Sequence, residues 1–264
     1  MKLRSNKSIL LLTFCISLLT IAACGDLLND SGSSAVFDWK KAPAIAEGND
    51  QLLTEQQKQN YIRDAEIIAV RYVNQRDSTQ TDIPDELIDI LYNGLVQIAT
   101  SDLRKARQVS REYRIHALAP DPREIIVYVN ANTPWIAGWK KGESTTGNEK
   151  ADKLIDQFNF SLADYTELNS EILATLRSNH AINGSAVGHL FEEINNVLYA
   201  GPDYIIGDGN HIQVLFFDDH LQFNFEYGFG DCPSGCINKH IWKFNVFQNG
   251  KVKFIGEQGT LPEI

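Results

Sequence analysis

Two cysteines near the C-terminal end of the chain are the residues best placed to do chemistry. Cys232 and Cys236 are separated by Pro-Ser-Gly, and His240 follows, which gives the spacing C-x3-C-x3-H. Such a group can form a disulfide, exchange electrons as a thiol pair, or bind a metal ion with the imidazole. Pro-Ser-Gly favours a tight turn, and a turn brings two Cα atoms within the roughly 4.4–6.8 Å that a disulfide needs. The sequence therefore predicts a structural disulfide between Cys232 and Cys236.

The redox and metal chemistries stay open as alternatives. Redox-active pairs are usually C-x-x-C at the start of a helix, whereas this pair is spaced more widely and lies between predicted strands. The metal alternative, with Cys232, Cys236 and His240 as ligands, rests on a resemblance. The loop is similar to the ligand loop of the binuclear copper site in cytochrome oxidase subunit two. That resemblance implies a methionine where this chain has Lys243, and a second histidine, which would be His211 or His220.

The N-terminus has the pattern of an exported protein. Three basic residues, Lys2, Arg4 and Lys7, precede an uncharged stretch over 9–23, and the first acidic residue is Asp26. A basic start, a short apolar core and small residues before a cleavage site are typical of a signal peptide. The apolar core is shorter than the about 20 residues that a membrane-spanning helix needs. We therefore expect residues 1–23 to be removed on export.

The run that ends at Cys24 indicates how the exported chain would be attached to the membrane. Residues 19–24, Leu-Thr-Ile-Ala-Ala-Cys, are similar to the lipobox of bacterial lipoprotein precursors. The resemblance implies cleavage before Cys24, a diacylglycerol on its sulfur and an acyl chain, such as palmitate, on the new amino terminus. It also implies the cell envelope as location, and Gly25 in place of an Asp favours the outer membrane, at its periplasmic face or the cell surface. A plain secretory signal or an uncleaved anchor is the alternative.

Export would change both the charge and the cysteine count of the chain. Loss of residues 1–23 takes the formal net charge from −10 to −13, because three basic residues leave. Binding to nucleic acid needs clustered Lys and Arg, so we expect no nucleic-acid partner, and the membrane would be reached through the lipid on Cys24. Cys15 would leave with the signal and Cys24 would carry the lipid, so Cys232 and Cys236 would remain together in an oxidising compartment. Closing so short a loop adds only about 2 kcal/mol, so the bond would mainly fix the shape of the loop.

The sequence predicts that an α+β fold positions the cysteine hairpin. Residues 24–50 are rich in small and polar residues and predict a flexible tether, followed by a globular domain over 51–264. This domain can also be divided into a helical part over 51–105 and a β-rich part over 106–264. Apolar residues at helical spacing predict an antiparallel helical pair that begins near Thr54 and Pro84.

Most of the remaining domain predicts strands. Alternating apolar residues indicate strands over 112–118, 124–130, 171–177 and 197–199, a helix over 185–195, and a loop over 132–153. The strongest pattern predicts a C-terminal β-meander over 212–217, 221–229, 239–247 and 251–255, with the cysteine hairpin between its two central strands.

The hairpin motif Gly-Asp-Cys-Pro-Ser-Gly-Cys-Ile, residues 230–237, is similar to one in uncharacterised secreted and lipoprotein domains of bacteria. The resemblance implies a discrete domain over most of residues 50–260 and no particular activity. Trp135 and Trp139 could form an aromatic platform for a glycan or another ligand, and core packing is the alternative.

No catalytic motif is present in the sequence. It has no Gly-x-Ser-x-Gly, no His-Glu-x-x-His and no phosphate-binding loop. We therefore expect a non-enzymatic binding or structural protein of the envelope, without a cofactor, whose partner is an unidentified envelope protein or glycan. An envelope enzyme or metal-binding protein is the second hypothesis. The third is a peptidase-inhibitor-like or chaperone-like module, because residues 184–203 faintly resemble part of the subtilisin propeptides.

Overall fold

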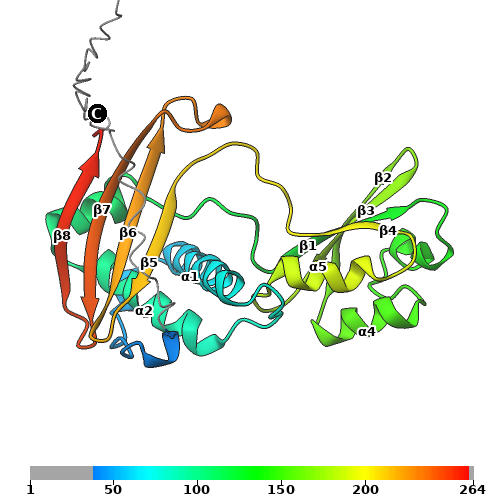
Figure 1. The fold of residues 1–264 in the computed structure, drawn as a ribbon, viewed down its shortest axis with the longest axis horizontal. Coiled ribbons are helices and arrows are strands. Elements are labelled where there is room, and N and C mark those ends of the chain that lie inside the picture. Colours follow the sequence, from blue (N-terminus) through cyan, green and yellow to red (C-terminus); the bar gives the residue numbers. More distant parts are fainter. Residues whose placement is uncertain (1–37, 262–264) are drawn as a thin grey trace, which may run out of the picture. The chain divides into compact units, whose positions relative to one another are not determined.

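A computed structural model of the chain describes residues 38–261. Its strands form two four-stranded antiparallel sheets, and helices pack against one face of each sheet (Figure 1). The predicted α+β fold is confirmed, including the N-terminal helical pair and the C-terminal meander with its disulfide hairpin. Within residues 38–261, no helix combines the length and the apolar character needed to cross a membrane.

The helical pair consists of α1, Glu55–Arg76, and α2, Asp85–Thr100. The start of α1 is fixed by a capping box, in which the Thr54 hydroxyl accepts from the Gln57 amide at 3.3 Å and the Gln57 side chain accepts from the Thr54 amide at 2.9 Å. Pro84 precedes α2 as its N-cap residue. In α2 the buried apolar residues recur every three or four positions, so this helix buries one side, whereas the middle of α1 is buried all round, from Asp64 to Ala69.

The helical pair packs on the C-terminal meander. Its strands are β5, His211–Phe216; β6, His220–Phe229; β7, Asn238–Phe247; and β8, Val252–Gly259, hydrogen-bonded in that order. Alternate residues of β6 and β7 point into the core, among them Phe223 and Phe244, both fully buried. The sheet and α2 approach closely at Gly94, where a Cβ would lie 2.4 Å from the Phe223 ring. This core therefore depends on a glycine at position 94.

The other sheet has the strand order β2-β3-β1-β4. Its strands are β1, Glu124–Asn130; β2, Ser161–Leu168; β3, Glu171–Arg177; and β4, Val197–Gly201. Two helices, α4, Glu149–Gln157, and α5, Gly184–Glu192, pack with this sheet around a second core (Figure 1). A Cβ at Gly188 of α5 would lie 2.2 Å from the Ala200 carbonyl oxygen, so the helix lies directly on β4.

Short helices complete the described part of the chain. The α-helix α3, Arg104–Arg107, runs into a π-helix, η3, Gln108–Glu112. Single 3-10 turns are η1, Trp39–Lys41; η2, Asp50–Leu52; η4, Pro134–Ala137; η5, Trp139–Lys141; and η6, Cys232–Ser234. The strand predicted over 112–118 is wrong, because no strand within residues 38–261 pairs with this segment and its backbone bonds to the Asp64 side chain and to Asn210. The loop predicted over 132–153 contains the start of α4.

The residues before α1 pack on the fold from residue 38 onward. Ile45 is buried in the first core, and the Ala46 amide donates to the Gln248 carbonyl oxygen at 2.9 Å. The Trp39 amide donates to the Tyr72 hydroxyl at 3.0 Å. Folded structure therefore begins before the predicted boundary at residue 51. Cys24 and the rest of the predicted tether lie outside the described residues.

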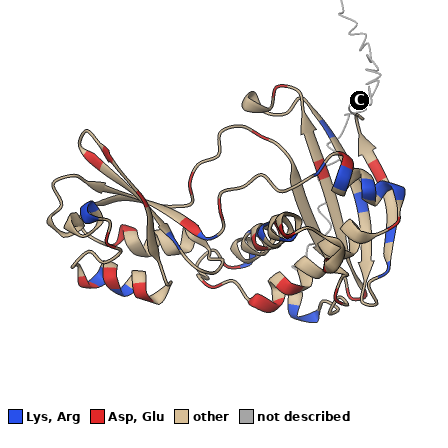
Figure 2. Ribbon diagram, turned by 180° about the vertical axis from the view of Figure 1, so that it is seen from behind, with Lys and Arg blue, Asp and Glu red and all other residues tan. Residues whose placement is uncertain are grey.

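Acidic and basic residues are interspersed over the helices and strands (Figure 2). Several of them form ion pairs, for example Arg123 with Glu66 and Arg177 with Asp121. Both sheets and their helices thus share a mixed charged surface.

Candidate functional site: an apolar pocket beside the disulfide

The predicted disulfide joins Cys232 and Cys236 in the turn between β6 and β7. The turn contains η6 and then Gly235, whose φ of 109° lies in a region that favours glycine. The disulfide packs over β6 at Gly228, where a Cβ would lie 2.5 Å from the Cys236 sulfur. The hairpin is therefore folded back onto its own strand.

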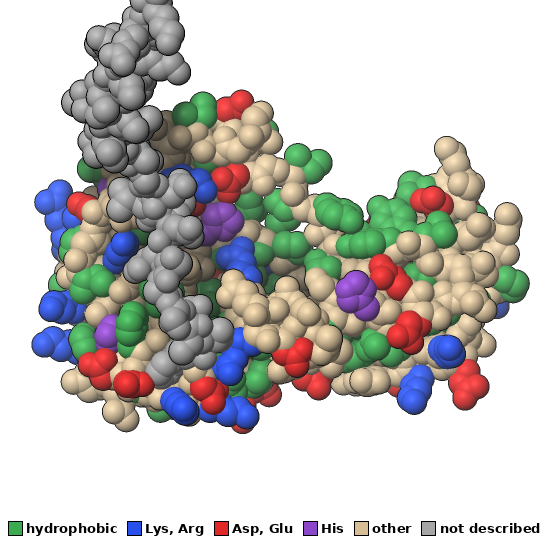
Figure 3. Space-filling view, viewed as in Figure 1, with side chains coloured by type: hydrophobic (Ala, Val, Ile, Leu, Met, Phe, Trp, Pro, Cys, Tyr) green, Lys and Arg blue, Asp and Glu red, His purple; other side chains and the backbone are tan. Residues whose placement is uncertain are grey.

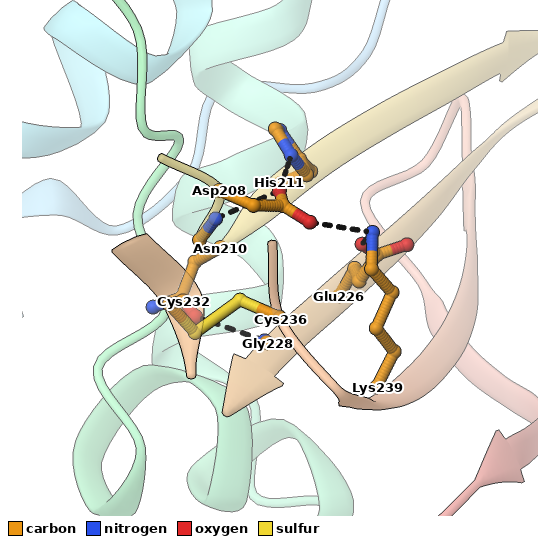
Figure 4. The surroundings of a disulfide bond; sticks show 9 residues. Asp208, Asn210, His211, Glu226, Gly228, Cys232, Cys236 and Lys239 are labelled. Atoms are coloured by element: carbon orange, nitrogen blue, oxygen red, sulfur yellow. Dashed lines mark hydrogen bonds and ion pairs between the residues drawn. A yellow bond between two sulfur atoms is a disulfide. The ribbon is translucent and has the colours of Figure 1, made fainter. Parts of the chain in front are cut away.

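A polar cluster surrounds the disulfide (Figure 4). The Asp208 carboxylate lies 3.0 Å from His211 Nε2, accepts from the Gly209 amide at 2.8 Å and pairs with Lys239 Nζ at 3.1 Å. Lys239 also pairs with Glu226 at 2.8 Å. The His211 contact, followed by the Gly209 and Lys239 contacts, holds the pKa of Asp208 well below its usual range. Asp208 is thus a carboxylate whose hydrogen-bonding capacity is largely used.

The segment that connects β4 with β5 is fastened to the disulfide hairpin. The Asp208 amide donates to the Cys232 carbonyl oxygen at 2.8 Å, and the Gly228 amide donates to Asn210 Oδ1 at 3.2 Å. On its other side, the Asn210 carbonyl oxygen accepts from the Leu118 amide at 2.9 Å. Residues 208–210 are therefore held between the hairpin and the segment around Leu118.

An apolar pocket of about 250 Å³ opens beside this cluster. Three segments line it: one side of α1, residues 118–122, and the connection between β4 and β5. The apolar part of the lining comes mainly from Ile67, Val70, Leu118, Pro120, Pro202 and Ile205. Figure 3 shows hydrophobic side chains gathered over the connection between β4 and β5.

Apolar side chains also remain exposed near the pocket. Ile206 is 90% exposed and Tyr204 is 69% exposed, and both belong to the segment that lines the pocket. Contiguous exposed apolar side chains commonly mark a binding surface in soluble domains. This part of the molecule therefore has the composition of a binding site.

Side chains of α1 fix the backbone of the wall at residues 117–119. The Asp64 carboxylate accepts from the Ala117 amide at 2.8 Å, and its other oxygen lies 2.6 Å from His116 Nδ1. Arg63 donates to the carbonyl oxygens of Ala117 and Ala119 at 3.2 and 2.6 Å. A segment without strand partners is thereby fixed in one conformation.

Three prolines stiffen the pocket further. Pro120, Pro122 and Pro202 all line it, and a proline ring fixes φ near −65°. The walls therefore have little backbone freedom to lose when a ligand enters. A preformed site binds more tightly than one that must be ordered on binding.

Arg71 contributes a positively charged side chain to the lining of this pocket. Arg71 Nη2 donates to the Leu118 carbonyl oxygen at 3.1 Å, and both residues line the pocket. Burial lowers the pKa of the Arg71 guanidinium, and the charge of Asp64 acts in the opposite direction. The site thus combines an apolar cavity with one cationic group.

No protein-family model, curated protein or solved structure matches this chain.

The aromatic platform predicted from Trp135 and Trp139 is not formed. Trp139 is 1% exposed in the second core, and its indole Nε1 donates to the Ser144 carbonyl oxygen at 3.0 Å. Trp135 is half-buried and packs edge-on against Trp139, with ring centroids 5.5 Å apart. Since one ring is enclosed by the core, the pair offers no shared face to a ligand.

The metal ligand set considered for Cys232, Cys236 and His240 is not brought together. The two sulfurs are bonded to each other, and His240 is buried on β7 with Nε2 3.4 Å from Glu257. Over residues 38–261, no group of three or more His, Cys, Asp or Glu side chains is placed to hold a metal ion. His211 belongs to the Asp208 cluster, and His220 stacks on Phe217 at 4.6 Å between centroids.

The sequence did not point to the pocket or to the Asp64–His116 pair. Their residues come from segments about 50 to 140 positions apart, and the lining is composed of ordinary aliphatic residues and prolines. The available signals were the prolines after residue 119 and the turn residues 207–210. Proline and glycine at these positions indicate turns, and a turn pattern does not by itself indicate a cavity.

Proposed function

We propose that this chain is a lipid-anchored protein of the bacterial cell envelope that binds an apolar ligand group without catalysing a reaction. The lipobox-like run ending at Cys24 supports the anchoring and the location. The pocket beside the disulfide supports the binding role, and it is the observation that carries the proposal.

The properties of the pocket match those of small-molecule sites. Such sites are concave, mostly apolar and largely preformed, with a few polar groups that orient the ligand. An apolar cavity of roughly 150 Å³ already accepts benzene. The pocket of about 250 Å³ therefore has room for a larger group, such as a short acyl chain or a substituted ring.

A neutral fluorescent probe, N-phenyl-1-naphthylamine, tests the binding role. We expect its fluorescence to rise on mixing with the protein, and Ala119→Leu to weaken its binding by about tenfold or more, because the added side-chain volume fills a pocket that has rigid walls. Ala119 is half-buried in the pocket wall. The measurement is a fluorescence titration at constant protein concentration.

Ala131→Leu is the matched control. Ala131 is also half-buried and follows β1, at the edge of the second core and outside the pocket lining. This variant should bind the probe as the wild type does. Equal probe binding by wild type and Ala119→Leu would contradict a binding role for the pocket.

Cys24→Ala tests the anchor. We expect the variant to lose palmitate labelling, and either to be released from the membrane fraction or to stall as the uncleaved precursor, because a single lipid-bearing residue would supply the attachment. The folded part should keep its thermal unfolding midpoint, since its described core begins after residue 38. Fractionation with palmitate labelling is the measurement. A wild-type chain that stays in the membrane without label would show an uncleaved anchor instead.

A further inference from the structure

Three charged or titratable side chains line the apolar pocket: Arg71, Asp208 and His211. Asp208 and His211 interact with each other, and Asp208 is also paired with Lys239. The negative charge of Asp208 is therefore balanced by protein groups. Arg71 is the lining residue whose charge is left to interact with a ligand.

The guanidinium of Arg71 has more donors than protein partners. Arginine carries five N–H donors, and the described residues provide one hydrogen-bond acceptor, the Leu118 carbonyl oxygen. No carboxylate among residues 38–261 lies within salt-bridge distance, 4.0 Å, of Arg71. Asp64, whose charge acts on Arg71, is already engaged by His116 and the Ala117 amide.

A partly buried cation without a counter-ion is unfavourable. Arg71 is half-buried, and arginine does not release its proton in proteins, so the group keeps its charge. Removing a charge from water costs free energy unless an opposite charge and hydrogen bonds compensate. An anionic group on a ligand would supply both at this position.

We propose that the pocket binds acyl carboxylates, with the apolar chain against Ile67, Val70 and Pro202 and the carboxylate on the Arg71 guanidinium. This inference rests on the proposed binding function and gives its ligand a chemical class. The planar fork of N–H donors in arginine matches the two oxygens of a carboxylate.

The sign of the charge decides against a cationic ligand. A cation would need Asp208 as its partner, but Lys239 and His211 already occupy that carboxylate. The acidic balance of the whole chain opposes anions only at long range, and at about 0.15 M salt such fields are screened beyond about 8 Å. The contact with Arg71 acts within that distance.

Displacement of N-phenyl-1-naphthylamine by three eight-carbon compounds tests the proposal. Octanoate, 1-octanol and octylammonium share the same apolar chain and differ in charge. At about pH 7, where the carboxylate is ionised, we expect octanoate to bind about tenfold more tightly than 1-octanol, and octylammonium to bind weakest.

Variants of Arg71 assign the preference to its charge. In Arg71→Gln, octanoate and 1-octanol should bind with nearly equal affinity, and the readout is the ratio of the two affinities in the same variant. Arg71→Lys keeps a cation and should retain part of the preference, without the planar fork. Arg107→Gln, which removes an exposed arginine of α3 outside the pocket, is the matched control and should leave the preference intact.

The outcomes separate the two proposals. If the wild type binds neither the probe nor any eight-carbon compound, the proposed function fails. If it binds octanoate and 1-octanol equally, the binding function stands and the carboxylate inference is overturned. A tenfold preference that persists in Arg71→Gln also overturns it. If Arg71→Gln abolishes all binding, Arg71→Lys decides. A preference for octanoate over 1-octanol in that variant supports the inference, and equal binding of the two compounds overturns it.

Discussion

Replacement of Trp139 by Ala should lower the free energy of unfolding by about 3–5 kcal/mol, the range found when large aromatic residues are removed from protein cores. Trp139 is 1% exposed and belongs to the core between the β1–β4 sheet and its helices. Its ring also packs edge-on against Trp135. A loss of this size is a large part of the about 5–15 kcal/mol that stabilises a typical domain.

The indole N–H adds to the expected loss. It donates to the Ser144 carbonyl oxygen, which fixes the loop that follows η5. The alanine variant leaves both a cavity and a carbonyl oxygen without this partner. Both effects lower the free energy of unfolding. Neither is removed by a small shift of neighbouring side chains.

Urea denaturation followed by circular dichroism measures the change. Trp135→Ala is the control, since Trp135 is half-buried and its indole lies 3.4 Å from the Asn195 carbonyl oxygen, a weak contact. The free energy of unfolding should fall clearly less in Trp135→Ala than in Trp139→Ala. If Trp139→Ala unfolds at the same urea concentration as the wild type and instead loses binding to a glycan, the ring serves as a ligand platform after all.

The parts of the fold that the sequence predicts are those in which one local pattern determines the structure. In β6, buried Leu221, Phe223 and Phe225 alternate with polar residues, so strand and burial follow together. The start of α1 follows from the Thr54–Gln57 capping box, which needs only two residues three positions apart. The disulfide follows from a turn between two cysteines.

Other elements depend on contacts that a local pattern does not contain. Ile115 and Ala117 are buried alternately, as in a strand, yet the backbone at Ala117 bonds to the Asp64 side chain instead of a neighbouring strand. Strand β2 was missed because most of its residues are exposed and many are polar. Its place is set by pairing with β3, and pairing depends on the partner strand.

The pocket could not be predicted for a related reason. Its existence depends on the space left between α1, residues 118–122 and the connection from β4 to β5. Each of those segments has an ordinary composition. In the sequence Arg71 is one of several charged residues of a helix, and its role follows from its position against Leu118.

Replacement of Asp64 by Ala should have the second large effect, because it removes a buried carboxylate that holds the pocket wall. Asp64 is fully buried on α1, and both of its oxygens have partners in the segment around residue 117. The variant leaves the Ala117 amide without an acceptor in a buried position, which costs about 1–3 kcal/mol, and it also loses the charge-assisted contact with His116. We expect the free energy of unfolding to fall by about 3 kcal/mol in urea denaturation.

The same substitution should weaken binding to the pocket, which distinguishes it from a purely structural loss. With the Ala117 amide released, residues 117–119 keep their contacts with Arg63, Arg71 and Asn210 but lose their bond to a buried carboxylate, so part of the wall must be ordered again when the probe enters. Asp64→Asn, which keeps a carbonyl oxygen for the amide, should recover most of the probe affinity. His116→Ala leaves the bond between Asp64 and the amide in place and should preserve probe binding. If Asp64→Ala binds N-phenyl-1-naphthylamine as tightly as the wild type does, the bond between Asp64 and the Ala117 amide does not shape the pocket.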